Sequence, residues 1–362
     1  MSKLKFALLG CGRIAPKHVD ALTSGAVPGA ELVAVCDTEV SRAQAIAQKH
    51  GVKAFGDRFE MLEKMGDQID VVSILTPSGL HAQHAIDMAK FRKHVVVEKP
   101  MALTLQDADQ MISACDAFGV RLFVVKQNRY NHPVKKLREA LEAGRFGKLV
   151  LGTVRVRWCR TQKYYDQDKW RGTWAYDGGV FANQASHHVD LLQWMMGDVE
   201  SVFAKTSTAL VNIETEDTGV VILKFKNGGL GIIEATTATR PKDLEGSISI
   251  LGEKGTVEIA GFAVNEMKTW NFSETQSGDS EVLDKYRNSP PNVYGFGHTE
   301  YLNKVVESIR EGRSALVDGL EGRKSLELIS AIYESVETGK EVSLRFVPKK
   351  CRLGQIQPGL TL

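Results

Sequence analysis

The sequence lacks the features that mark secreted, membrane-spanning or nucleic-acid-binding proteins. Its five cysteines are odd in number, scattered and never paired as CxxC, which argues against a disulfide framework or a zinc site. No stretch approaches the ~18 consecutive apolar residues that a membrane-spanning helix needs. The 46 basic and 44 acidic residues leave a formal net charge of only +2, too small a surplus to attract nucleic acid. We therefore expect a cytoplasmic protein that binds neither membrane nor nucleic acid.

The composition is that of a folded chain with about two domains. Of the 362 residues, 43% are apolar and 25% are charged. In the first third, apolar strands alternate with helical patterns. Strands are expected at 5–9, 31–36, 52–55, 71–75, 94–97 and 121–125, and helices at 16–24, 39–50, 58–64, 81–90 and 105–118. This alternation predicts a parallel, doubly wound sheet forming a first domain over residues 1–125.

The pattern changes after residue 125, where strands follow one another and several are joined by hairpin-like turns. Strands are expected at 149–158, 199–208, 218–225, 230–239, 244–251 and 255–259, helices at 133–142, 300–310 and 322–338, and a polar loop at 273–291. We expect a second domain over residues 126–346, built on a mostly antiparallel sheet. Residues 347–362 have no pattern and are interpreted as a C-terminal tail.

The run Gly10-Cys11-Gly12-Arg13-Ile14-Ala15 fits the G-x-G-x-x-G/A fingerprint of dinucleotide-binding proteins. A predicted strand precedes it and a predicted helix follows it, so the turn can bring backbone close to a pyrophosphate at a helix N-terminus. Asp37 ends the second strand, where a carboxylate accepts hydrogen bonds from ribose hydroxyls and repels a 2′-phosphate. These residues predict an NAD site, with Gly10, Gly12, Arg13, Ile14 and Asp37 as cofactor-binding residues.

The carboxyl edge of the predicted parallel sheet carries more polar residues, and ligands bind at this edge in such folds. Glu98 and Lys99 directly follow the fifth strand, so we expect the lysine to point toward the nicotinamide ring. An alternative is a solvated loop with a chance charge pair. Thr76, Pro77 and His81 follow the fourth strand and are expected at the nicotinamide side as well.

The segment 170–190 is the richest in candidate residues. Asn183 and His187 are four residues apart, so on a helix they would share one face. Histidine is the commonest general base, which makes His187 a candidate, although a hydrogen-bonded structural role is the alternative. The nearby His188 and Asp190 do not complete a set of ligands at zinc-like spacing, so no metal is expected.

The GCGRIA turn, the EKP triplet and the GG-x-x-x-N-x-x-x-H-x-x-D run resemble the glucose–fructose oxidoreductase/inositol dehydrogenase (Gfo/Idh/MocA) family. The resemblance spans nearly the whole chain. It implies a Rossmann domain, a C-terminal α/β domain with a large open sheet, and dimers or tetramers. It also implies that Lys99 and His187 are the catalytic pair, and it favours a cis bond between Lys99 and Pro100. Many members have Asp at the position of Asn183, which leaves the base open between His187 and Lys99.

Further segments, including VKQNR, the NQASH core and LEGSISILGEKGTV, resemble one subgroup of this family. That subgroup oxidises the 3-hydroxyl of UDP-N-acetyl-D-glucosaminuronate with NAD, in the biosynthesis of lipopolysaccharide O-antigen. Such a substrate carries two phosphates and a carboxylate, so its site needs cations and amide donors. The expected substrate-binding residues are Lys99, Lys126, Asn128, Arg129, Arg160, Tyr165, Asn183, Gln184, Ser186 and His187.

Two alternatives remain at the level of the sequence. The chain could oxidise a free polyol or simple sugar, or it could be a nucleotide-binding regulator that has kept the fold without catalysis. The sequence also leaves open whether NADH leaves after each cycle or is reoxidised in place by a second substrate such as 2-oxoglutarate.

Overall fold

The computed structural model describes residues 2–287, 297–313, 316–345 and 351–355. The chain forms two compact units. The first contains the chain up to Lys126 together with His298–Arg323, and the second contains Gln127–Gly297 together with the described residues from Lys324 onward. The expected tail at 347–362 lies outside the described residues except for 351–355. None of the described helices is long and apolar enough to cross a membrane.

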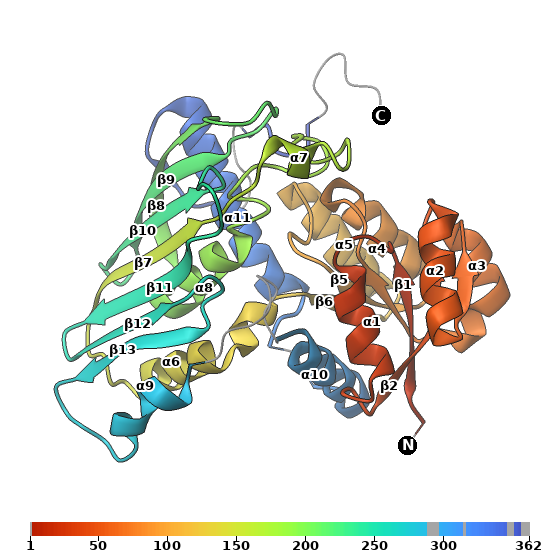
Figure 1. Ribbon diagram of the computed structural model, residues 1–362, viewed down its shortest axis with the longest axis horizontal. Coiled ribbons are helices and arrows are strands. Elements are labelled where there is room, and N and C mark those ends of the chain that lie inside the picture. Colours follow the sequence, from red (N-terminus) through yellow and green to blue (C-terminus); the bar gives the residue numbers. More distant parts are fainter. Residues whose placement is uncertain (1, 288–296, 314–315, 346–350, 356–362) are drawn as a thin grey trace. The chain divides into compact units, whose positions relative to one another are not determined.

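The first unit is built on a sheet of six parallel strands in the order β3-β2-β1-β4-β5-β6. Its strands are β1 (Leu4–Leu9), β2 (Ala30–Cys36), β3 (Lys53–Phe55), β4 (Val71–Ile74), β5 (His94–Val97) and β6 (Leu122–Val124). β4 is buried along its whole length because helices cover both faces of the sheet (Figure 1). The expected doubly wound sheet is therefore confirmed.

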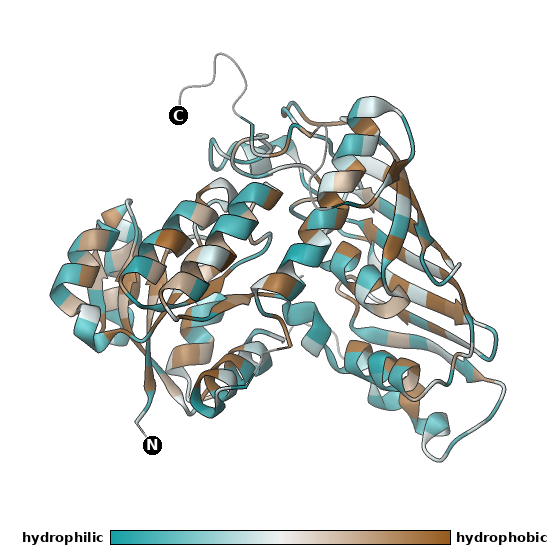
Figure 2. Cartoon of the chain, turned by 180° about the vertical axis from the view of Figure 1, so that it is seen from behind, coloured by the Kyte–Doolittle hydropathy of each residue, from teal (hydrophilic) through white to brown (hydrophobic). Residues whose placement is uncertain are grey.

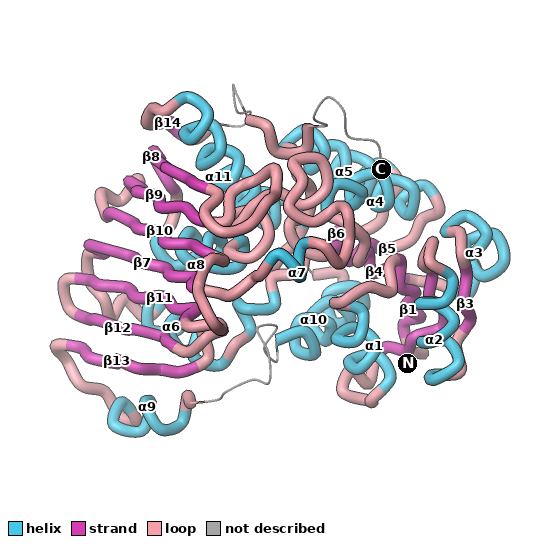
Figure 3. The backbone as a smooth tube through the Cα atoms, turned by 45° about the horizontal axis from the view of Figure 1, so that its top comes forward, coloured by secondary structure: helices cyan, strands magenta, loops and turns pink. Residues whose placement is uncertain are grey.

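The helices of the first unit are α1 (Ala15–Thr23), α2 (Val40–His50), α3 (Arg58–Met65), α4 (His81–Lys90), α5 (Leu105–Ala117) and α10 (Gly297–Glu311), with 3₁₀ turns η1 (Gly66–Gln68) and η2 (Ser78–Leu80). Asp57 and Thr104 accept hydrogen bonds from backbone N–H groups at the starts of α3 and α5, as N-cap residues do. Helix α10 comes late in the sequence but lies beside α1 (Figures 1 and 3), where Asn303 Nδ2 donates to Ala26 O over 3.1 Å.

The second unit is built on an eight-stranded sheet in the order β13-β12-β11-β7-β10-β9-β8-β14. Its strands are β7 (Leu149–Arg157), β8 (Val199–Ser207), β9 (Thr218–Phe225), β10 (Leu230–Thr236), β11 (Glu245–Gly252), β12 (Gly255–Ala260), β13 (Glu266–Phe272) and β14 (Val342–Ser343). Only β10 and β7 pair in parallel; the other pairs of neighbours are antiparallel. The expectation of a mostly antiparallel sheet is confirmed.

Helices cover one face of this sheet and leave strands exposed on the other (Figures 1 and 3). The helices of the second unit are α6 (His132–Glu142), α7 (Gln162–Tyr165), α8 (Ser186–Met196), α9 (Val282–Lys285) and α11 (Gly319–Thr338), of which α11 begins in the first unit and α7 lies beyond the strand ends (Figures 1 and 3); the 3₁₀ turns are η3 (Gln127–Tyr130) and η4 (Asp279–Glu281). Helix α8 packs closely because β7 has Gly152, where a Cβ would lie 2.7 Å from the side chain of Leu192. On the open face, Val220, Ile222, Leu230 and Ile232 are exposed, and apolar and polar residues alternate along the strands (Figure 2).

Candidate active site

The glycine turn after β1 has the conformation that the fingerprint requires. Gly10 has a φ of +102°, and a Cβ there would lie 2.8 Å from the backbone carbonyl carbon of Leu75, so no other residue fits. A Cβ on Gly12 would meet nothing within 4 Å, which leaves that side of the turn open to a ligand. Arg13 and Ile14 then lead into α1, whose N-terminus favours an anion. The turn therefore fits the pyrophosphate of a dinucleotide.

Asp37 directly follows β2 and contacts the glycine turn. Its Oδ2 accepts the Cys11 N–H over 2.7 Å, and its Oδ1 accepts the Glu39 N–H over 2.8 Å. Each carboxylate oxygen has a second lone pair, so a half-buried Asp37 can still accept ribose hydroxyls. The role of Asp37 at the adenosine ribose therefore stays a prediction that its remaining lone pairs allow.

The loop after β4 is tied to the loop after β5 by His81. Its Nδ1 lies 2.8 Å from Pro100 O, and its Nε2 lies 2.8 Å from Thr76 O. Burial lowers the pKa of His81, and a neutral ring has one N–H to donate to these two carbonyls. The ring can therefore donate to only one of these carbonyls and contacts the other without a hydrogen bond, and Pro77 directly follows Thr76.

Glu98 and Lys99 follow β5, and the Lys99–Pro100 bond is cis, which confirms that expectation. Glu98 is only 6% exposed. Its Oε1 lies 2.9 Å from His18 Nε2 and 3.5 Å from His298 Nε2, while its Oε2 accepts the Lys99 N–H over 3.2 Å. Burial would raise the pKa of Glu98, but the two imidazoles stabilise the carboxylate and hold its pKa well below the ordinary value.

Sequence reasoning missed this cluster, in which atoms of His18, Glu98 and His298 lie within 4.8 Å of one another. Three such residues have the donor chemistry of a metal site. Zinc lies about 2.0–2.2 Å from its nitrogen and oxygen ligand atoms. In a tetrahedral site, two ligand atoms are therefore about 3.3 Å apart or more. The 2.9 Å between His18 Nε2 and Glu98 Oε1 is instead the length of a hydrogen bond, so we interpret His18 and Glu98 as a hydrogen-bonded pair, with His298 in longer contact beside it.

In the second unit, His187 lies in the first turn of α8 and is 6% exposed. Its Nε2 lies 2.9 Å from the amide nitrogen of Gln127, a buried residue of η3 that sequence reasoning did not identify as a site residue. The adjacent His188 points elsewhere and packs edge-on against Trp158, with ring centroids 5.7 Å apart. Burial lowers the pKa of His188 to about 4, so this ring is neutral.

The expectation that Asn183 and His187 share a helix face is wrong, because α8 begins only at Ser186. Asn183 lies in the preceding turn, where its N–H donates to Gly179 O over 3.0 Å and its side-chain amide donates to Asp177. Ser186 Oγ in turn donates to Asn183 O over 2.9 Å. The side chain of Asn183 is therefore oriented by a carboxylate rather than by helical spacing.

The buried carboxyl of Glu216 accepts hydrogen bonds that stabilise the turn before α8. Glu216 Oε1 accepts the Phe181 N–H over 3.2 Å and the Tyr333 hydroxyl over 2.8 Å. A Cβ on Gly179 would lie 2.0 Å from Glu216 Oε2, so the position requires glycine. Burial raises the pKa of Glu216 to about 7. Nothing in the sequence pattern singled out Glu216 or Tyr333 for this role.

The expected substrate-binding cations differ in how they are held. Arg129 makes two bonds of 2.8 Å to Asp190 and stacks on Trp194, so a buried carboxylate balances its charge. Lys126, the last residue of the first unit, is 3% exposed and follows β6. Asn128 is buried in η3, with its Oδ1 unpartnered among the described residues.

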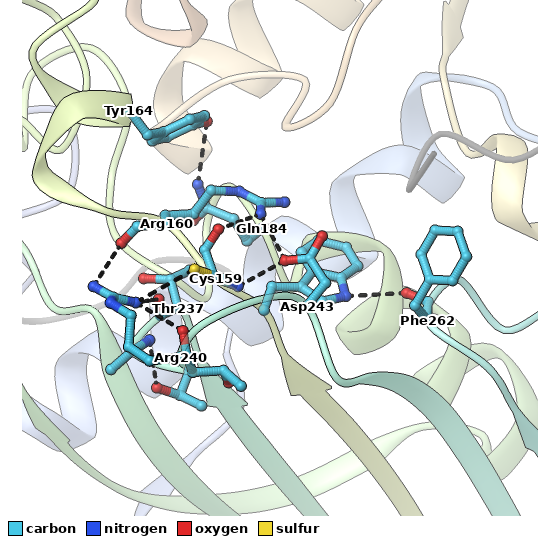
Figure 4. Close-up of polar contacts among 12 residues, drawn as sticks. Cys159, Arg160, Tyr164, Gln184, Thr237, Arg240, Asp243 and Phe262 are labelled. Atoms are coloured by element: carbon cyan, nitrogen blue, oxygen red, sulfur yellow. Dashed lines mark hydrogen bonds and ion pairs between the residues drawn. The ribbon is translucent and has the colours of Figure 1, made fainter. Parts of the chain in front are cut away.

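Arg160 lies in a cluster of polar side chains above the strand ends of the second unit (Figure 4). One of its guanidinium nitrogens donates to Asp243 over 2.9 Å, and the guanidinium stacks on Trp158 and Tyr164. Gln184 Nε2 lies 3.5 Å from the Tyr164 hydroxyl. The last of the expected residues, Tyr165, is buried, and its hydroxyl lies 3.1 Å from Thr237 Oγ1.

The fold and the glycine turn define a dinucleotide-dependent oxidoreductase with a Rossmann domain and a large-sheet domain. Residues 4–126 match the NAD-binding Rossmann fold of the GFO_IDH_MocA oxidoreductase family, and residues 138–344 match its C-terminal alpha/beta domain. The chain belongs to the Gfo/Idh/MocA family, and it is an NAD-dependent dehydrogenase.

Two solved structures are similar over most of the chain. One is the WlbA dehydrogenase of Bordetella pertussis in complex with NADH and UDP-GlcNAcA, 44% identical, with a TM-score of 0.87 over 95% of this chain and 98% of that one. The other is WlbA of Chromobacterium violaceum with the same two ligands, 45% identical, with a TM-score of 0.89 over 95% and 97%. Myo-inositol 2-dehydrogenase of Thermotoga maritima is 30% identical over 95% of this chain and 99% of its own length.

Proposed function

We propose that this protein oxidises the 3-hydroxyl of UDP-N-acetyl-D-glucosaminuronate to a ketone with NAD, in the biosynthesis of a diacetamido uronic acid for lipopolysaccharide O-antigen. The observation that carries the proposal is 44–45% identity, across 95% of the chain, to two dehydrogenases that bind UDP-GlcNAcA and NADH. The inositol and sugar dehydrogenases among its relatives are more distant, at 30% identity or less over comparable lengths.

Cations in both units support an anionic substrate. Lys126 and Arg160 are the cations best suited to the phosphates and the carboxylate, because Arg129 already makes a bidentate pair with Asp190. Neutral partners would come from the turn before α8 and from the segments near it. These are Asn128, Tyr165, Asn183, Gln184 and Ser186.

The proton of the 3-hydroxyl needs a base, because a free alkoxide is too unstable. We assign that role to His187. The amide nitrogen of Gln127 can only donate, so His187 Nε2 carries a lone pair, and the substrate hydroxyl would replace Gln127 at this nitrogen to give up its proton. Lys99 would donate a hydrogen bond to the same hydroxyl oxygen and stabilise the charge that develops there. When bound, NAD accepts the hydride from the carbinol carbon; Gly10, Gly12, Arg13, Ile14, Asp37, Thr76, Pro77, His81, Glu98 and Lys99 are the residues proposed to hold it.

The test is a turnover assay with UDP-N-acetyl-D-glucosaminuronate and NAD, with and without 2-oxoglutarate. We expect NADH absorbance to rise and mass spectrometry to show a product two hydrogens lighter. Sustained turnover only with 2-oxoglutarate would mean that NADH is reoxidised in place. Lys99→Ala is the negative control. Activity with myo-inositol and none with the UDP-sugar would contradict the proposal and favour oxidation of a free polyol, the activity named for the Thermotoga relative.

A further inference from the structure

Buried histidines hold the residues on both sides of Lys99. His18 comes from α1, His81 from α4 and His298 from α10, so three separate helices converge on the short segment 98–100. All three rings are nearly fully buried, with exposed fractions of 0%, 1% and 3%. Burying an imidazole costs free energy for each ring nitrogen left without a hydrogen bond. His18 Nδ1 and both ring nitrogens of His298 have no hydrogen-bond partner among the described residues, so the concentration of these rings at one segment needs an explanation.

On the N-terminal side, the Glu98 carboxylate joins α1 and α10 to the backbone of Lys99. His18 donates to Oε1 over 2.9 Å, and His298 Nε2 lies 3.5 Å from the same oxygen. The two rings also pack edge-to-face, with centroids 5.6 Å apart. The second carboxylate oxygen, Oε2, accepts the Lys99 N–H over 3.2 Å. The carboxylate thus links α1, through a hydrogen bond, and α10, through a longer polar contact, to the backbone of Lys99.

On the C-terminal side, His81 acts on the next residue. Its Nδ1 lies 2.8 Å from the carbonyl oxygen of Pro100, and its Nε2 lies 2.8 Å from Thr76 O at the end of β4. Lys99 therefore lies between two residues, Glu98 and Pro100, that each contact a buried ring. A side chain on such a segment starts from a defined backbone position, which matters because misplacement by about 1 Å can cost a hundredfold in rate.

We propose that His18 and His298 are positioning residues for Lys99, acting through the carboxylate of Glu98. The proposal rests on the proposed function, in which Lys99 acts on the reacting hydroxyl. His18 makes the shorter contact and is the stronger of the two. Neither histidine is assigned a contact with substrate, so their effect should be on the rate of the reaction rather than on the binding of NADH.

The experiment compares His18→Leu, which removes the donor, with His18→Gln, whose amide nitrogen reaches as far as Nε2. We expect kcat to fall roughly tenfold to a hundredfold in His18→Leu. The KM for NAD and the NADH dissociation constant should stay within about threefold of the unmodified protein, and His18→Gln should recover most of the rate. His298→Leu should show the same pattern with a smaller loss.

The matched control is His94→Leu, at the opposite end of β5, where the ring accepts the Arg121 N–H over 3.0 Å. This change should lower the melting temperature without lowering kcat. A second readout is hydrogen exchange of the Lys99 amide, the donor to Glu98 Oε2. The exchange rate of this amide should be higher in His18→Leu than in His18→Gln or His94→Leu. This expectation does not depend on which sugar the enzyme oxidises.

If the unmodified protein does not oxidise the UDP-sugar, the proposed function fails, and the exchange measurement alone decides the positioning role. An unchanged kcat and unchanged exchange in His18→Leu would overturn it. So would loss of NADH binding in parallel with kcat and no recovery in His18→Gln, since that is the behaviour of a merely structural residue. Stoichiometric metal in the purified protein that is lost in His18→Leu would also overturn it, because the cluster would then be a metal site.

Discussion

Replacing Glu216 by glutamine should make the second unit more stable at neutral and alkaline pH. Burial raises the pKa of this carboxyl from the ordinary 4.5 to about 7 in the folded protein. Below pH 4.5 it is protonated in both states, so the folded state carries no penalty. Between 4.5 and 7 the unfolded state ionises first and is favoured, and above 7 the penalty is complete. One pKa unit corresponds to about 1.4 kcal/mol, so the cost approaches about 3 kcal/mol.

Glutamine suits the site because the contacts of Glu216 need only one acceptor. The Phe181 N–H and the Tyr333 hydroxyl both donate to Oε1, which a glutamine carbonyl can replace. The second oxygen lies over Gly179 and has no partner among the described residues, so an amide group there gives up no hydrogen bond, but its unpaired N–H groups offset part of the gain. The substitution therefore removes the charge at nearly constant shape.

The assay is urea unfolding at pH 5, 6, 7 and 8, followed by the fluorescence of buried tryptophans such as Trp174, whose ring packs on Tyr333. We expect Glu216→Gln and the unmodified protein to be similar at pH 5, with the variant gaining up to about 3 kcal/mol at pH 8. Glu200→Gln, at an exposed ion pair with Lys224, is the control and should show no such trend. A variant that is less stable than the unmodified protein at pH 8 would refute the reasoning.

Three further outcomes follow from the structure. Asp37→Ala should reduce the preference for NAD over NADP at least about tenfold in kcat/KM, because ribose hydrogen bonds to a charged group are lost; equal use of both by the unmodified enzyme would contradict this. His187→Asn and Lys99→Ala should each lower kcat ~10² or more with little change in NADH binding, whereas near-normal turnover and an unchanged pH profile in His187→Asn would assign the base to Lys99. Ile222→Glu, on the open sheet face, should shift a dimer or tetramer toward monomer in analytical ultracentrifugation, and an unchanged sedimentation coefficient would exclude this face as the interface.

Much of the fold could be predicted from local patterns because those patterns reflect burial. Strand β4, apolar except for Ser73, lies inside a sheet covered on both faces, and a nearly continuous apolar run is the signature of such a strand. The turn at Gly10 could be predicted because its φ of +102° and its closeness to Leu75 exclude any other residue. In both cases, neighbours in the sequence carry the whole physical requirement.

The sequence could not predict features that depend on packing between distant segments. Helix α10 belongs to the first unit, yet an amphipathic pattern shows only that a helix buries one face, and not against which sheet. Its residue His298 therefore could not be linked to Glu98, 200 positions earlier. Strand β13 was missed because its buried residues, Met267 and Trp270, do not alternate regularly; the register of its pairing with β12 shifts between Glu258 and Ile259.

The sequence also could not tell which candidate cations bind a ligand. A charged side chain is available to a ligand only if the fold gives it no stronger partner. Arg129 and Arg160 look alike in the sequence as cations near predicted strand ends. In the structure, Arg129 makes two bonds to Asp190 with both side chains 3% exposed, a pair that is expensive to break because it would leave a buried charge. The side chain of Asp243, which pairs with Arg160, is 31% exposed. Water can therefore solvate the Asp243 carboxylate when Arg160 moves away to bind an anion. Of the two, Arg160 is the better candidate for a substrate phosphate, and Arg129 is the better candidate for holding η3 against α8.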